Sequence, residues 1–143
     1  MTKSEKAIIF MLRIDAVAEL AAIVAVLMPF SMMQQIYERG IGMSDMPGGP
    51  LVEYLARSIS AFYVLHGALT LFISFDINRY WPLIRFWAVS FVVLGFALLG
   101  IDFTAQLPWY WTLSEGLFPI VFGTVLLMLH RNASIAKTRG GKE

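Results

Sequence analysis

Residues 86–101 read FWAVSFVVLGFALLGI, a run without a single charged side chain. A strand of a membrane barrel would alternate polar and apolar side chains, whereas this run is apolar on every face. A helix needs about 20 mostly apolar residues to cross the hydrocarbon core of a bilayer. Four stretches of the chain meet this requirement, and we predict that each is a membrane span: residues 14–33, 54–75, 82–101 and 109–130.

The composition agrees with this prediction. Hydrophobic residues make up 58% of the 143 residues, charged residues only 15%, and the mean hydropathy is +0.69. These values lie outside the range of ordinary soluble domains. We therefore predict an all-α fold: a single integral membrane four-helix bundle over residues 1–143, with up-down-up-down topology.

The first stretch could be mistaken for a signal peptide, because basic residues precede it. It is, however, longer than the apolar region of a typical signal peptide. It also carries two acidic side chains, Asp15 and Glu19. We therefore expect this stretch to remain in the protein as the first span.

The lysines and arginines favour one side of the membrane. Cytoplasmic segments of membrane proteins are enriched in these residues, so their distribution predicts that both termini are cytoplasmic. Residues 34–52 then form the longest outer loop, and residues 131–143 form a cytoplasmic tail that we expect to fray. Of the eleven cations, only Arg39 and Arg57 fall on the outer side, and the other nine are Lys3, Lys6, Arg13, Arg79, Arg85, Arg131, Lys137, Arg139 and Lys142.

Three aromatic residues, Trp109, Tyr110 and Trp111, open the fourth stretch at its outer end. Amphipathic rings favour the boundary between lipid and water, so we interpret them as an interfacial aromatic belt. An aromatic cage for a cationic ligand is the alternative interpretation, but it would need further rings from elsewhere in the chain.

Four ionisable residues are predicted near the outer surface. A charge in hydrocarbon costs about 2.5 to 3.5 kcal/mol on insertion scales, so such groups usually find partners inside the bundle. Glu53 and Arg57 have the i, i+4 spacing of a helical ion pair. Asp102 and Glu115 flank the aromatic belt and could reach the same arginine. We expect this outer polar cluster to lock the helices together, and a polar binding site is the alternative.

A second, inner polar cluster consists of Asp15, Glu19 and Arg85, which have similar depths near the cytoplasmic surface. Asp15 and Glu19 are like charges at i, i+4, and they repel unless a cation intervenes or one carboxyl holds a proton. A static ion pair between Glu19 and Arg85 is one interpretation. The other makes Glu19 a proton-binding group.

His66 lies near the middle of the second span, far from either surface. We expect it to form a hydrogen bond with a neighbouring helix. At about 100° per residue, Arg57 and His66 fall on opposite faces of their helix, so one narrow interior should not receive both. The second span would then be sandwiched between neighbours or contact another subunit.

Several classes of chemistry have no support in the sequence. The chain has no cysteine, which excludes disulfides and thiolate chemistry. His66 and His130 differ in depth by about 13 Å, so they cannot ligate one haem within a monomer. No zinc-protease, phosphate-loop or Ser-His-Asp pattern is present. We assign no catalytic residue, no metal site and no cofactor.

Two blocks, VEYLARSISAFY at residues 52–63 and RYWPLIRFWAVSFVVLGFALLGIDFTAQLPWYWTLSEG at residues 79–116, carry a family resemblance. They look like an uncharacterised family of small four-span bacterial membrane proteins, and the resemblance extends over roughly residues 14–130. It implies four helices and a bacterial inner (cytoplasmic) membrane. It implies no activity.

These observations favour a non-enzymatic membrane protein, either an accessory subunit or a binder of a lipid or lipophilic small molecule. The expected partners are membrane lipid and either a protein that contacts the outer loop or a second copy of this chain. Nucleic acid is not an expected partner, since the cations show no recognition motif. A proton-coupled small-solute carrier, acting as a homo-oligomer through Glu19 or His66, is the alternative. A third possibility is an intramembrane lipid-modifying enzyme, with Arg57, Asp102 and Glu115 holding phosphate or transferring protons.

Overall fold

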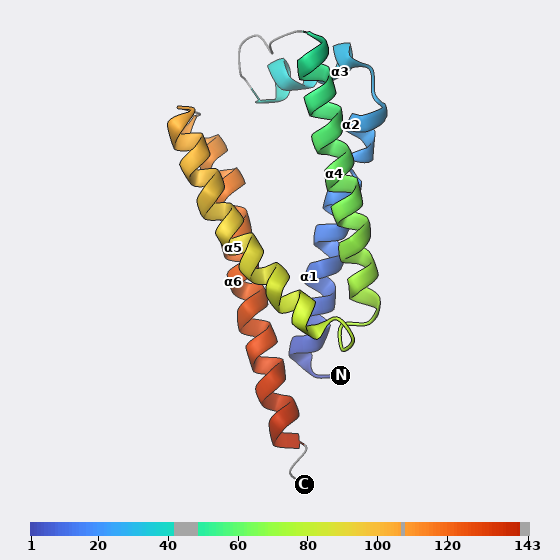
Figure 1. Cartoon of the computed structure of the whole chain (residues 1–143), viewed down its shortest axis with the longest axis vertical. Helices are drawn as coiled ribbons and strands as arrows, with labels where there is room; N and C mark the ends of the chain where they lie inside the picture. The colour runs from blue at the N-terminus through green and yellow to red at the C-terminus, as the bar shows by residue number, and fades with distance from the viewer. Residues whose placement is uncertain (42–48, 107, 141–143) are drawn as a thin grey trace. The chain divides into compact units, whose positions relative to one another are not determined.

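The computed structural model describes residues 1–41, 49–106 and 108–140 and is built from helices (Figure 1). Within these ranges no residue lies in a strand, so the all-α prediction is confirmed. Three of the helices are long and apolar enough to cross a membrane. They are α4 (Pro50–Phe75), α5 (Trp81–Thr104) and α6 (Trp109–Gly140).

Proline marks the beginning of two of these helices. Pro50 is the first residue of α4, and Pro82 lies in the first turn of α5. The first turn of a helix has no intrahelical partner for its N–H groups, so a residue without an N–H fits there at little cost. Both helices therefore start close to where the apolar runs predict.

The predicted first span, residues 14–33, is not one helix in the structure. It takes in the end of α1 (Lys3–Leu20), all of α2 (Ile23–Leu27) and the beginning of α3 (Phe30–Ile36). The π-helical η1 (Tyr37–Ile41) follows α3. Pro29 separates α2 from α3, because it has no N–H and its ring disfavours a helical conformation of the preceding residue. Met28 is accordingly extended, with φ −70° and ψ 153°. This apolar run is therefore broken where hydropathy alone predicts continuity.

The frayed tail predicted for residues 131–143 is also incorrect as far as the structure describes it. α6 continues as helix to Gly140. Side-chain hydroxyls tie this part to its own backbone, since Ser134 Oγ donates to the carbonyl of His130 and Thr138 Oγ1 to that of Ser134. Ala133 is fully buried, so packing extends past the end of the apolar run.

The chain separates into two compact units. The first comprises Met1–Met11 and Ile73–Glu143, and the second Leu12–Phe72. α5 and α6 belong to the first unit, most of α4 belongs to the second, and α1 is divided between the two units after Met11. A single four-helix bundle therefore stays a prediction.

In the first unit, α5 and α6 pack as an antiparallel pair whose facing positions repeat every seven residues. Glycine permits the close approach, because a Cβ at Gly95 would lie only 2.6 Å from the carbonyl oxygen of Gly116. Seven residues are close to two helical turns, so the same face recurs along each helix. The facing pairs are Trp81 with His130, Ala88 with Gly123, and Gly95 with Gly116.

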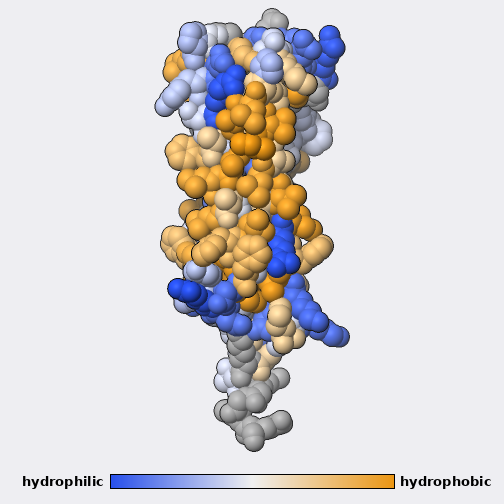
Figure 2. Space-filling model, turned by 90° about the vertical axis from the view of Figure 1, so that its right-hand side faces the viewer, coloured by the Kyte–Doolittle hydropathy of each residue, from blue (hydrophilic) through white to orange (hydrophobic). Residues whose placement is uncertain are grey.

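Much of the apolar surface of the long helices is exposed. Only 22% of the most apolar window of α4, 22% of that of α5 and 28% of that of α6 is buried. Figure 2 shows hydrophobic side chains gathered on the visible face, with hydrophilic ones toward its ends. Such a surface is unfavourable in water and favourable in hydrocarbon. This exposure indicates a membrane protein.

Candidate functional site

Arg57, the cation of the outer polar cluster, is held entirely within the second unit. Its Nε donates to Glu53 Oε1 at 3.0 Å, as the i, i+4 spacing predicts. Its two terminal nitrogens donate to the carbonyl oxygens of Val26, at 2.5 Å, and Met28, at 3.1 Å. These carbonyls lie at the end of α2, where the break at Pro29 removes their helical donors. The planar fork of the guanidinium thus replaces backbone hydrogen bonds that the proline abolishes.

Asp102 and Glu115, the other two members of the outer polar cluster, lie in the first unit. Their contact with Arg57 stays a prediction. Asp102 is 3% exposed, and its Oδ2 has no hydrogen-bond partner among the described residues. It extends the seven-residue series of Trp81, Ala88 and Gly95, so it lies on the face of α5 that meets α6. This seven-residue spacing is visible in the sequence, and it alone is enough to place Asp102 on that face of the helix.

Glu19 and His66 meet within the second unit. Glu19 Oε2 and His66 Nδ1 are 2.5 Å apart, which is a hydrogen-bond distance. The contact depends on Gly67, where a Cβ would lie 2.9 Å from the carbonyl oxygen of Ala16 and 2.9 Å from the Cβ of Glu19. His66 therefore has the interhelical hydrogen bond that we predicted. Arg85 lies in the other unit, so its ion pair with Glu19 stays a prediction.

Arg57 and His66 contact the same neighbouring segment, contrary to the expectation that one interior cannot receive both. Their nine-residue separation does place them about 180° apart around α4. Gly67, however, lies on a face of α4 that is in close contact with α1, about 80° from Arg57 and about 100° from His66. The two side chains therefore reach around opposite flanks of α4 to residues 19–28.

Two further polar groups lie one turn from the Glu19–His66 contact. Asp15 precedes Glu19 by four residues and is 4% exposed, and Thr70 follows His66 by four residues and is fully buried. Asp15 Oδ2 and Thr70 Oγ1 have no hydrogen-bond partner among the described residues. The antiparallel register of α1 and α4 places these two residues level with each other. No group of three residues suited to a metal ion occurs in the described part of the chain.

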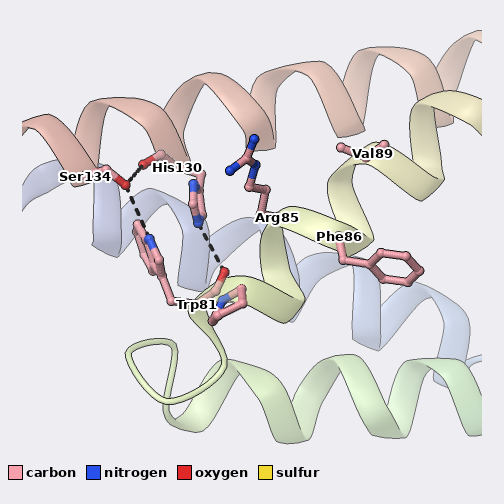
Figure 3. Close-up of a pocket in the computed structure, with 7 residues that line it drawn as sticks. Trp81, Arg85, Phe86, Val89, His130 and Ser134 are labelled. Carbon is pink, nitrogen blue, oxygen red and sulfur yellow. Dashed lines mark hydrogen bonds between the residues drawn. The ribbon is translucent and has the colours of Figure 1, made fainter.

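A different arrangement occupies the end of the α5–α6 pair. The rings of Trp81 and His130 are stacked, with centroids 4.1 Å apart and an interplanar angle of 24°. His130 Nε2 donates to the carbonyl oxygen of Trp81 at 3.1 Å, because a carbonyl can only accept. Trp81 Nε1 donates to Ser134 Oγ at 3.3 Å. These contacts fix the register of the two helices (Figure 3).

These residues border a pocket of about 530 Å³, which we call the α5–α6 pocket. Figure 3 shows Trp81, His130 and Arg85 gathered at one end and Phe86 further along α5. Arg85 is exposed, and it makes no ion pair or hydrogen bond with the described residues of the first unit. The pocket is lined by Trp81, Pro82, Arg85, Phe86, Val89, His130 and Ser134.

The polar groups of the α5–α6 pocket suit binding better than catalysis. Ser134 resembles half of a Ser-His dyad, but its hydroxyl donates to the backbone carbonyl of His130 at 3.0 Å. The Nε2 of His130 is occupied by the carbonyl of Trp81. The imidazole Nε2 thus cannot accept the serine proton as a general base does. The pocket therefore provides one cation, Arg85, next to the apolar side chains of Phe86 and Val89.

Sequence reasoning placed Arg85 among the inner ionisable residues but did not find this pocket. The sequence does contain the seven-residue spacing that pairs Trp81 with His130. Finding the pocket also requires the register of the two helices, that is, which residue of α5 lies opposite which residue of α6. That register follows from close glycine contacts such as Gly95 with Gly116, which a single helix pattern does not specify.

The aromatic belt begins α6. Trp109 is 74% exposed, Tyr110 is exposed, and their rings form an edge-to-face pair with centroids 6.1 Å apart. Trp111 is half-buried. The outer loop predicted at residues 34–52 is described only for residues 34–41 and 49–52, and the rest lies outside the described residues.

Comparisons with protein-family models, with curated proteins and with solved structures find no match for this chain. The resemblance of residues 52–63 and 79–116 to small four-span bacterial membrane proteins therefore stays a prediction.

Proposed function

We propose that this chain is a non-enzymatic integral membrane protein, either an accessory subunit of a membrane assembly or a binder of a lipid or a lipophilic small molecule. We place it in a bacterial inner membrane with four crossings and both termini in the cytoplasm. The three long apolar helices support insertion in a membrane. The distribution of lysine and arginine supports the orientation.

The observation that carries this proposal is the α5–α6 pocket. It combines a largely apolar lining with one exposed cation, Arg85. The hydrogen-bonding groups of Trp81 and Ser134, and Nε2 of His130, are engaged with protein atoms. A ligand would therefore be held by apolar contact and charge, with few directed hydrogen bonds. That is how lipophilic molecules with a single polar group are bound.

Native mass spectrometry of the full chain, purified in mild detergent, tests this proposal. We expect a lipophilic molecule or lipid, or a partner subunit, to remain associated with the protein. Chemical crosslinking in the membrane before purification checks that the association exists there. Recovery of a ligand-free monomer by both methods would contradict the proposal.

A proton-coupled carrier, acting as a homo-oligomer, is a second candidate function. The Glu19–His66 contact favours it, because a carboxyl and an imidazole are hydrogen-bonded to each other one helical turn from the buried Asp15. Reconstitution in vesicles with a pH-sensitive dye tests this function. We expect Glu19→Gln and His66→Ala to reduce proton flux. Unchanged flux in both variants eliminates both residues as proton carriers.

A further inference from the structure

We propose that the α5–α6 pocket binds an anionic phospholipid, with the lipid phosphate on Arg85 and an acyl chain along Phe86 and Val89. This inference rests on the proposed lipid-binding function and specifies the chemical class of the lipid.

The first argument is charge. Arg85 is exposed and makes no ion pair or hydrogen bond with the described residues of the first unit, although it lies beside the apolar residues of the pocket. Arg79 and Arg131 lie at the same end of the α5–α6 pair. Asp102, at the far end of α5, is about 26 Å away along the helix axis. An anion at Arg85 would therefore meet an excess of positive charge.

Two carboxylates of the first unit, those of Asp76 and Glu5, are already engaged. Asp76 Oδ1 accepts the backbone N–H of Arg79 at 3.1 Å. Glu5 is 4% exposed, and its Oε2 accepts the backbone N–H of Thr2 at 2.7 Å. Both carboxylates thus serve local turns or helix starts. A phosphate fits the planar guanidinium well, because two of its oxygens can accept parallel N–H groups.

The second argument is depth. Trp81 begins α5, Arg85 lies about 6 Å further along the axis, and Val89 about 12 Å. An indole at the end of a span favours the interface, and an arginine one turn deeper can extend its charged end to the headgroups. Phe86 and Val89 continue the wall into the hydrocarbon depth. From the interface inward, the cation therefore comes first and the apolar surface follows. This order matches a phospholipid, whose phosphate lies nearer the interface than its acyl chains.

The third argument distinguishes anionic from zwitterionic lipids. A choline headgroup carries its own positive charge next to the phosphate, so this lipid gains less than an anionic lipid from the contact with Arg85. Phosphatidylglycerol presents the same phosphate without that cation. In the proposed topology this end of the pair faces the cytoplasmic leaflet, where anionic lipids attract basic side chains.

Lipid binding to the delipidated full chain, measured by native mass spectrometry in mixed micelles, tests the inference. Phosphatidylglycerol and phosphatidylcholine with identical acyl chains are added in equal amounts. We expect phosphatidylglycerol to bind roughly fivefold more strongly, the effect of about one favourable charge contact at a membrane surface. Arg85→Gln should abolish this preference.

Arg131→Gln is the matched control, since Arg131 is an exposed arginine at the same end that does not line the pocket. It should keep most of the preference. Arg85→Lys retains the charge without the planar fork and should keep part of it. Circular dichroism and size-exclusion chromatography verify that each variant is folded. The wild-type headgroup comparison tests the inference even if Arg85→Gln does not fold.

Three results would overturn the inference while leaving the proposed function intact. They are equal binding of the two lipids, an undiminished preference in folded Arg85→Gln, and displacement of phosphatidylglycerol by millimolar inorganic phosphate, which would indicate a simple anion site. If neither lipid binds and no other lipophile or subunit is retained, the proposed function fails with the inference.

Discussion

His66 Nδ1 on α4 lies 2.5 Å from Glu19 Oε2 on α1, beside Gly67, where the two helices are in close contact. Without a side chain at residue 67, the α1 backbone approaches α4 closely enough for the carboxyl to reach the imidazole. The polar contact and the close packing therefore depend on each other.

Replacing Gly67 with alanine should separate α1 from α4. The new Cβ would lie 2.9 Å from the backbone carbonyl oxygen of Ala16, which cannot rotate away. We expect a loss of about 1 to 3 kcal/mol in stability, the usual cost of overpacking. Thermal unfolding in detergent measures it.

Gly100→Ala is the matched control, because nothing lies within 4 Å of a Cβ at Gly100. Alanine favours helix over glycine, so this variant should be as stable as the parent or slightly more stable. Equal melting temperatures for Gly67→Ala and the parent would show that the close α1–α4 contact is absent.

Replacing Arg57 with leucine should destabilise the second unit. The carbonyl oxygens of Val26 and Met28 would lose their donors at the break before Pro29. Each unsatisfied group costs about 1 to 3 kcal/mol when buried. We expect a lower melting temperature in detergent for Arg57→Leu, and a smaller decrease for Glu53→Gln, which leaves both carbonyl contacts in place. If Arg57→Leu and the parent have the same melting temperature, the guanidinium does not stabilise the break between α2 and α3.

Truncation of Trp81 should loosen the end of the α5–α6 pair. Trp81→Phe removes the bond to Ser134 but keeps a ring against His130, so we expect a loss of about 1 kcal/mol. Trp81→Ala also removes the stacked ring, and the loss should rise to about 3 kcal/mol. Unfolding in detergent measures both values. Equal stability of the two variants would mean that the stacking contributes nothing.

The long helices could be predicted from the sequence because hydropathy alone defines them. α4 ends at Phe75 as predicted, and α6 begins at Trp109 as predicted. Hydropathy does not report backbone hydrogen bonding, so it missed the break at Pro29. It also ended the last helix at His130, although Ala133 is buried and the helix continues.

Contacts within one helix could be predicted, and contacts between helices could not. The Glu53–Arg57 pair follows from i, i+4 spacing alone. The partner of His66 depends on the register of α1 against α4, which the contact at Gly67 sets. The α5–α6 pocket likewise depends on the register that pairs Trp81 with His130. A single sequence shows which residues are polar, but register decides which of them meet.

The central claim is that these helices cross a membrane in the proposed orientation, and cysteine labelling tests it most directly. The chain has no cysteine, so single substitutions give an unambiguous signal. Asn78→Cys lies between α4 and α5, Ala105→Cys follows α5, and both positions are exposed. The test uses intact bacterial cells whose outer membrane, if they have one, does not block the reagent. A membrane-impermeant maleimide should label Ala105→Cys in these cells. It should label Asn78→Cys only after the cells have been permeabilised. Labelling of both positions from the same side would contradict the account.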